Sequence, residues 1–142
     1  MAAKVIRAIP KQQYDYTTTM DAANKVSFWA ATHVEVSQYK EVTLVARLHE
    51  WDTSNAQQID IALYNDGCTD EDPKSSFFED LGQGKSLNFT ETTEGAPYLK
   101  MAVATSADDA LAANVAIKVT LTQGSNAANC SVVVSADLIL RN

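Results

Sequence analysis

The chain has 142 residues, enough for one domain with one hydrophobic core and too few for a second. Its 11 Lys and Arg stand against 18 Asp and Glu, which gives a formal net charge of −7. Nucleic acids and anionic membrane surfaces are bound through clustered Lys and Arg. This charge balance therefore argues against nucleic acid and against a membrane as partners.

No segment of the sequence has the pattern of a targeting signal or a membrane helix. The start, from Met1 to Arg7, lacks the continuous apolar region of a secretory signal, and no apolar run approaches the ~20 residues of a membrane helix. We therefore expect a protein that is made and folded in a cytoplasm, where Cys68 and Cys130 are favoured as free thiols. A disulfide between them is the open alternative. A zinc site is not expected, because neither cysteine has a CxxC partner.

Alternation of apolar and polar residues with a period of two dominates the sequence and predicts strands with one buried face. The segment 131–141 is apolar on both parities, which predicts a strand that is buried on both sides or lies in a subunit contact. In chain order, the predicted strands are 4–9, which Pro10 ends, 14–20 as an edge strand or arm, 26–36, 42–51, 59–64, 87–89, 98–105, 113–122 and 131–141.

The segments between these strands carry turn-forming residues. Gly, Asn, Asp, Ser and Pro recur in 51–58, 93–97 and 123–129. About eight short strands separated by such turn signals predict an all-β fold, either a sandwich or a barrel. We expect residues 1–20 to form an N-terminal arm or edge strand and residues 21–142 to form a β-sandwich domain.

The motifs of the common enzyme classes are absent. There is no GxSxG elbow, HExxH motif, GxGxxG loop or Walker-type glycine loop. His33 and His49 fall in different predicted strands, so neither has the spaced partner of a general base or a metal ligand. By the alternation, His49 lies on the same, wetter face as Arg47. We expect that the protein is not an enzyme and uses no cofactor.

An acidic stretch follows the predicted strand 59–64 and contains Asp66, Asp70, Glu71 and Asp72. Ca²⁺ prefers several oxygen ligands, which a loop of this composition can supply. The spacing does not match the EF-hand pattern, so a solvated loop is the favoured interpretation and no metal site is predicted. A bound Ca²⁺ stays open.

Aromatic side chains suggest a second kind of site, a platform on which sugars stack. Trp51 ends a predicted strand and is followed by Asp52, which makes Trp51 and Tyr64 the candidate platform. The favoured alternative is that Trp29 belongs to the core and that Trp51 caps the edge of the sandwich.

Five segments stand in a recognisable order: VEVSQYKEVTL at 34–44, IDIALY at 59–64, LNFT at 87–90, YLKMAV at 98–103 and AIKVTL at 116–121. In pattern and spacing they resemble the small capsid decoration (cement) proteins and related head proteins of tailed bacteriophages. The resemblance covers most of residues 26 to 122. It implies a jelly-roll-like antiparallel β-sandwich on the outer face of a capsid, often a homotrimer, that clamps capsid subunits against internal DNA pressure. Such proteins have no active site.

The resemblance makes the major capsid protein the expected partner. It makes the virion the expected location, after synthesis in the host cytoplasm. The N-terminal segment is the expected contact, because arms and exposed strands can add to a partner's sheet. Its apolar side chains are Val5, Ile6, Ile9, Tyr14 and Tyr16. The alternative function is a carbohydrate-binding β-sandwich module of a phage tail or fibre, which would use Trp51 and Tyr64.

Overall fold

The computed structural model describes residues 3–16, 25–51, 56–66, 78–80, 86–90, 98–106, 111–123 and 130–142. These residues form nine strands: β1 (Lys4–Tyr16), β2 (Lys25–Glu35), β3 (Glu41–Trp51), β4 (Ala56–Asp66), β5 (Phe78–Asp80), β6 (Ser86–Thr90), β7 (Tyr98–Thr105), β8 (Asn114–Gln123) and β9 (Cys130–Arg141). Among the described residues, no helix is long and apolar enough to cross a membrane.

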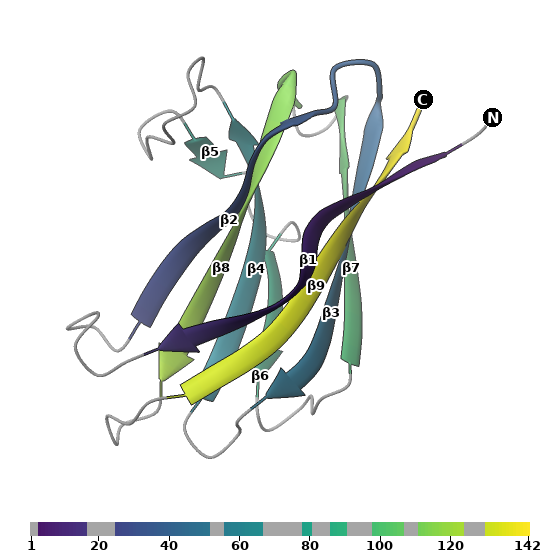
Figure 1. The fold of residues 1–142 in the computed structure, drawn as a ribbon. Helices are drawn as coiled ribbons and strands as arrows, with labels where there is room; N and C mark the ends of the chain where they lie inside the picture. The colour runs from purple at the N-terminus through teal and green to yellow at the C-terminus, as the bar shows by residue number, and fades with distance from the viewer. Residues whose placement is uncertain are drawn as a thin grey trace.

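The strands form two antiparallel sheets that face each other (Figure 1). Sheet A has the order β1-β9-β3-β7. Sheet B has the order β2-β8-β4-β5, with β6 also paired to β4. Leaving β5 aside, each sheet has four strands, and the chain crosses repeatedly from one sheet to the other. This is the order of a jelly roll. The prediction of an all-β, jelly-roll-like sandwich is therefore confirmed.

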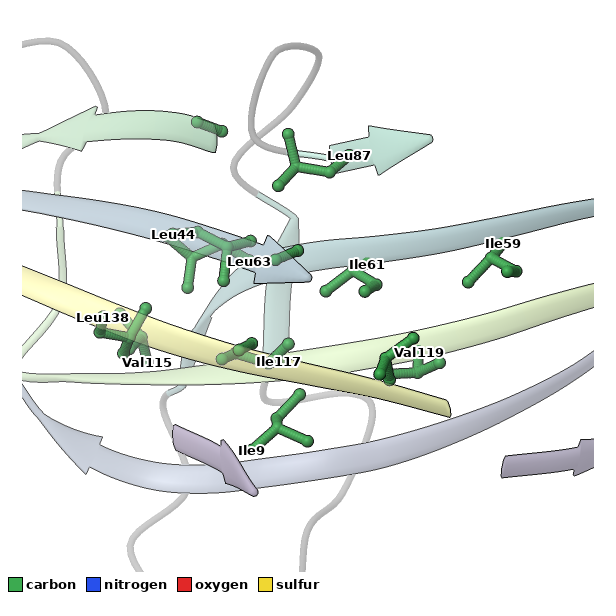
Figure 2. Packing of buried hydrophobic residues seen from close by; sticks show 14 of the residues in the cluster. Ile9, Leu44, Ile59, Ile61, Leu63, Leu87, Val115, Ile117, Val119 and Leu138 are labelled. Atoms are coloured by element: carbon green, nitrogen blue, oxygen red, sulfur yellow. The ribbon is translucent and has the colours of Figure 1, made fainter. Parts of the chain in front are cut away.

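The core lies between the two sheets and follows from the two-residue alternation. On β3, Val42, Leu44, Ala46 and Leu48 are buried, and on β8, Val115, Ile117, Val119 and Leu121 are buried. Figure 2 shows side chains of both sheets pointing into the shared layer. Each large side chain that is fully buried contributes about 1.5–3 kcal/mol of transfer free energy. The described ones are Phe89, Ile9, Leu44, Leu48, Ile59, Ile61, Leu63, Ile117, Leu121, Leu138 and Leu140.

β1 continues past Pro10, where the sequence predicted that it would end. It pairs with β9 from Lys4 to Tyr16, with register shifts on both sides of Ile9. Sheet A tolerates Pro10 because β1 is an edge strand, where a missing N–H donor need not remove a ladder hydrogen bond. Residues 17–20 of the predicted arm lie outside the described residues. The described part of the N-terminal segment belongs to the sheet.

β2 departs from simple alternation. Its register against β8 shifts between Trp29 and Ala31 and again between Ala31 and Val34. In the second of these irregular stretches His33 has a φ of 57°, which is uncommon for a residue other than glycine. Residues of both parities of β2 pack against the core as a result, Phe28, Ala30 and Val34 from one parity and Ala31 from the other. Trp29 precedes both shifts. It follows the core-facing Phe28 and lies opposite Lys118, so it is on the outer face of sheet B.

The shared core yields a stability prediction. Ile117→Ala should lower the free energy of unfolding by about 2–5 kcal/mol, because it removes apolar contacts and leaves a cavity between the sheets. Val103→Ala, at an exposed position on β7, should change it by less than about 0.5 kcal/mol. Urea denaturation of both variants measures this. Equal losses for the two would contradict the assignment of Ile117 to the core.

Candidate functional site

The outer face of sheet A combines apolar and charged side chains in rows that cross the strands. One row runs Val5–Ile139–Thr43–Val103, the next runs Arg7–Asp137–Val45–Met101, and the third runs Ser135–Arg47–Leu99. All four large hydrophobic residues that are exposed in the described part of the chain lie in these rows: Val5 (62%), Leu99 (46%), Met101 (57%) and Val103 (44%). We call this surface the A face.

The three arginines of the sequence, Arg7, Arg47 and Arg141, all lie on the A face. Arg47 donates a hydrogen bond to Asp137 Oδ2 at 2.6 Å, and Arg7 Nε lies 2.5 Å from Asp137 Oδ1. Arg141 donates to Glu41 Oε2 and to Thr43 Oγ1. Asp137 is almost fully buried beneath its two partners. Each arginine is therefore paired with a carboxylate and held at a fixed position in the face.

His49 lies at the end of the same face and hydrogen-bonds Ser135 Oγ through Nε2, at 2.8 Å. This confirms the predicted side of β3 on which His49 lies. Burial lowers its pKa below the ordinary value of 6.5, and the nearby Lys11, Arg47 and Arg7 lower the pKa further, while Glu50 opposes them. The positive charges around His49 thus favour its neutral form in the folded protein.

The predicted partner-binding residues of β1 do not share one surface. Val5 is exposed on the A face and Ile6 is partly buried, whereas Ile9 and Tyr14 belong to the core. Tyr14 also packs against Phe28 of β2, with 5.4 Å between ring centroids. The side chain of Tyr16 lies outside the described part. In this structure Ile9 and Tyr14 are not accessible to a partner, and a contact through Val5 stays a prediction.

The outer face of sheet B, which we call the B face, holds an aromatic pair that the sequence did not predict. Trp29 of β2 and Tyr64 of β4 meet edge to face, with centroids 5.1 Å apart. Trp29 is therefore outside the core, contrary to the favoured interpretation. The two residues of the predicted platform belong to different sheets: Trp51 pairs with Val132 in sheet A, and Tyr64 pairs with Ala116 in sheet B. The side chain of Trp51 is not among those described.

The start of the acidic stretch has a structural role. Asp66 is buried, and its Oδ2 accepts a hydrogen bond of 2.6 Å from the backbone N–H of His33. Asn65 Oδ1 accepts another from the N–H of Ala112. Asp70, Glu71, Asp72 and Cys68 lie outside the described residues, as does the side chain of Cys130. Within the described part, no group of His, Cys, Asp or Glu side chains is arranged to hold a metal ion.

A hollow of about 120 Å³ lies at one end of the sandwich. Its lining residues are Lys4, Glu35, Ser37, Gln38 and Tyr39. It is smaller than the ~300–1,000 Å³ typical of small-molecule sites, so the two sheet faces are the better candidates for function.

The comparisons with known proteins point to the fold. No protein-family model and no curated protein matches the chain. Two similar solved structures are that of the Gx strain of infectious bursal disease virus, with a TM-score of 0.56, and that of the VP2 subviral particle of the same virus, with a TM-score of 0.54; both are 13% identical in sequence. Each match covers 97% of this chain but only 31% or 32% of the viral chain, so this chain spans about a third of the length of the viral chains. At this identity the likeness shows that the jelly-roll fold is shared with viral capsid proteins.

A carbohydrate-binding module is also among the similar structures. The module CBM28, which is specific for non-crystalline cellulose, matches 92% of this chain and 73% of its own, at 11% identity and a TM-score of 0.40. That score is too low to support an argument about function.

The lowered pKa of His49 leads to a pH prediction. The folded protein binds a proton at His49 less readily than the unfolded chain does, so the free energy of unfolding should fall as the pH drops below about 6.5. Above about pH 7.5 His49 is neutral in both the folded and the unfolded state, so it no longer makes the free energy of unfolding depend on pH. His49→Gln should reduce the loss between about pH 7.5 and 5.0, as measured by urea denaturation. An unchanged pH dependence in the variant would contradict the prediction.

Proposed function

We propose that the protein is a structural virion protein that binds the outer surface of a capsid and reinforces the contacts between capsid subunits. In this proposal the partner is the major capsid protein and the protein works as a homotrimer on the virion. It acts by contact and not by catalysis. The observation that carries the proposal is the A face, a broad sheet surface on which exposed apolar side chains surround fixed arginines.

The composition of the A face fits a protein contact. Arg and Met are enriched in protein interfaces, and exposed apolar side chains gathered on one surface mark interaction sites. Leu99, Met101 and Val103 form an apolar row along β7. Arg7 and Arg47 are already held in place by their ion pairs with Asp137. Docking of a partner therefore costs less side-chain entropy than it would with two unpaired arginines.

The charge distribution supports the same surface. The described A face and its rim carry Arg7, Lys11, Arg47 and Arg141 against Glu41, Glu50 and Asp137, a formal charge of about +1. The rest of the sequence is then strongly acidic, because the whole chain carries −7. A surface with this charge balance does not repel a second acidic protein. Many copies on a particle would add strength through repeated attachment.

The proposal is tested by particle binding. Met101→Glu places a charge in the apolar row and should weaken binding of the protein to the particle by roughly tenfold or more, as expected for a residue in the centre of an interface. Ser27→Glu adds the same charge to an exposed position of sheet B and should leave binding unchanged. Co-sedimentation of labelled protein with particles from the native source measures both.

Two outcomes contradict different parts of this proposal. If the native protein does not co-purify with any particle in a regular copy number, the virion function is wrong. If it does, and Met101→Glu binds like wild type, the A face is not the contact. Removing residues 1–20 is a poorer test, because it also removes Ile9 and Tyr14 from the core. Val5→Glu tests the N-terminal contact without that loss.

The alternative function, a carbohydrate-binding module of a phage tail or fibre, stays a prediction. Its two predicted platform residues belong to different sheets, Trp51 to sheet A and Tyr64 to sheet B.

A further inference from the structure

The centre of the B face is built from two rings and a lysine over a floor of alanines. Trp29 and Tyr64 belong to strands on opposite sides of β8, yet their centroids are only 5.1 Å apart. They can meet because Ala116, which lies opposite Tyr64 on the intervening β8, is small. Ala116 and Ala62, which lies opposite Lys118 on β4, are both buried although they belong to the outer face of the sheet. The rings therefore form an assembled, partly buried unit.

Lys118 lies within this unit. Its ammonium nitrogen is 5.4 Å from the centroid of Trp29 and 5.0 Å from that of Tyr64, within the range of cation–π contacts. Within the described residues Lys118 has no carboxylate partner. This differs from the A face, where all three arginines are paired with Asp137 or Glu41. The aromatic rings hold a positive charge at the surface of an acidic protein without neutralising it.

A polar row runs beside the aromatic unit. The row crosses four neighbouring strands and consists of Ser27 on β2, Thr120 on β8, Asp60 on β4 and Asn88 on β6. The row is ordered by its own contacts: Ser27 Oγ and Thr120 Oγ1 are 2.9 Å apart, and Gln58 Nε2 donates to Asp60 Oδ1 at 2.8 Å. Alternate residues on a strand are about 6.6 Å apart, a distance comparable to the size of one sugar ring. Hydroxyl-binding side chains therefore lie one sugar ring away from the aromatic pair.

We infer that the B face is a binding site for a carboxylate-bearing sugar, such as a uronic acid or a sialic acid within an oligosaccharide. Lys118 binds the sugar carboxylate, the exposed parts of Trp29 and Tyr64 contact the apolar C–H face of the ring, and Asp60 with its neighbours binds hydroxyl groups. The carboxylate of Asp60 repels that of the sugar, which fixes the orientation of the ligand along β8 and β4. This site does not depend on the proposed capsid contact, because the A and B faces lie on different sheets.

The inference is tested with two acidic probes, trigalacturonate and sialyllactose, and with lactose as the neutral control. The two tryptophans of the chain are Trp29 and Trp51, so Trp51→Phe leaves Trp29 as the only tryptophan reporter. In that background, an acidic probe should change the fluorescence of Trp29 saturably, and lactose should bind at least about tenfold more weakly. Isothermal titration of the unmodified chain provides the affinity independently.

Matched substitutions test whether the positive charge of Lys118 binds the acidic probe. Lys118→Met keeps the aliphatic stem over the rings and should weaken binding of the acidic probe by about tenfold or more, whereas Lys118→Arg should stay within about threefold of wild type. Lys11→Met removes the same charge from an exposed position on β1 and should have no effect. Three results would overturn the inference: no saturable binding of either acidic probe, equal binding by Lys118→Met, or equal weakening by Lys11→Met. None of them bears on whether the A face binds a particle.

Discussion

The structure depends on one constraint, the burial of a single apolar layer between two sheets. Each strand therefore turns one of its two faces toward that layer, and the two-residue period then determines which side chains lie on the outer face. On β3 this places Leu44 and Leu48 in the core and turns Thr43, Val45 and Arg47 toward the outer face, where Thr43 and Val45 are nevertheless buried. The core therefore selects the composition of both outer faces, and those faces carry the candidate functions. A slip of one residue in β3 would bury Arg47 and expose Leu44.

The outer faces differ in how their charges are balanced. Asp137 is nearly buried and lies between Arg7 and Arg47, so sheet A carries an internal network whose loss would leave charges without partners. On sheet B the rings of Trp29 and Tyr64 hold Lys118, which has no carboxylate partner among the residues that the structure describes. A paired network gives rigidity and suits a large contact, whereas an uncompensated charge among aromatic rings suits a small anionic ligand. The two proposals follow from this difference.

Most strand positions could be predicted from the sequence, and even the irregular β2 (Lys25–Glu35) lies close to its predicted range of 26–36. On β3 and β8 the apolar parity identifies the residues that face the core, although Thr43, Val45 and Ala116 of the opposite parity are buried as well. β2 contains two register shifts and a positive φ at His33, and no local pattern in the sequence indicates them. Trp29 precedes both shifts, and alternation from the core-facing Phe28 places it on the outer face. The contact of Trp29 with Tyr64 depends on strand order, since it requires β8 to lie between β2 and β4. Sequence spacing does not determine strand order, so the B face could not have been found from it.

The edges of sheet A also explain why its face is the proposed contact. An open edge strand can pair with another chain, and proteins commonly block this with proline or lysine. On β1 the edge carries Pro10 and irregular register around Ile9. On β7 the ammonium of Lys100 donates to the carbonyl of Asn88 in β6 and lies over Phe89, so this lysine ties the edge to the opposite sheet. Both edges are thus poor templates for strand addition, whereas Leu99, Met101 and Val103 point outward from the same β7. A partner that recognises this protein gains more from covering the face than from extending the sheet.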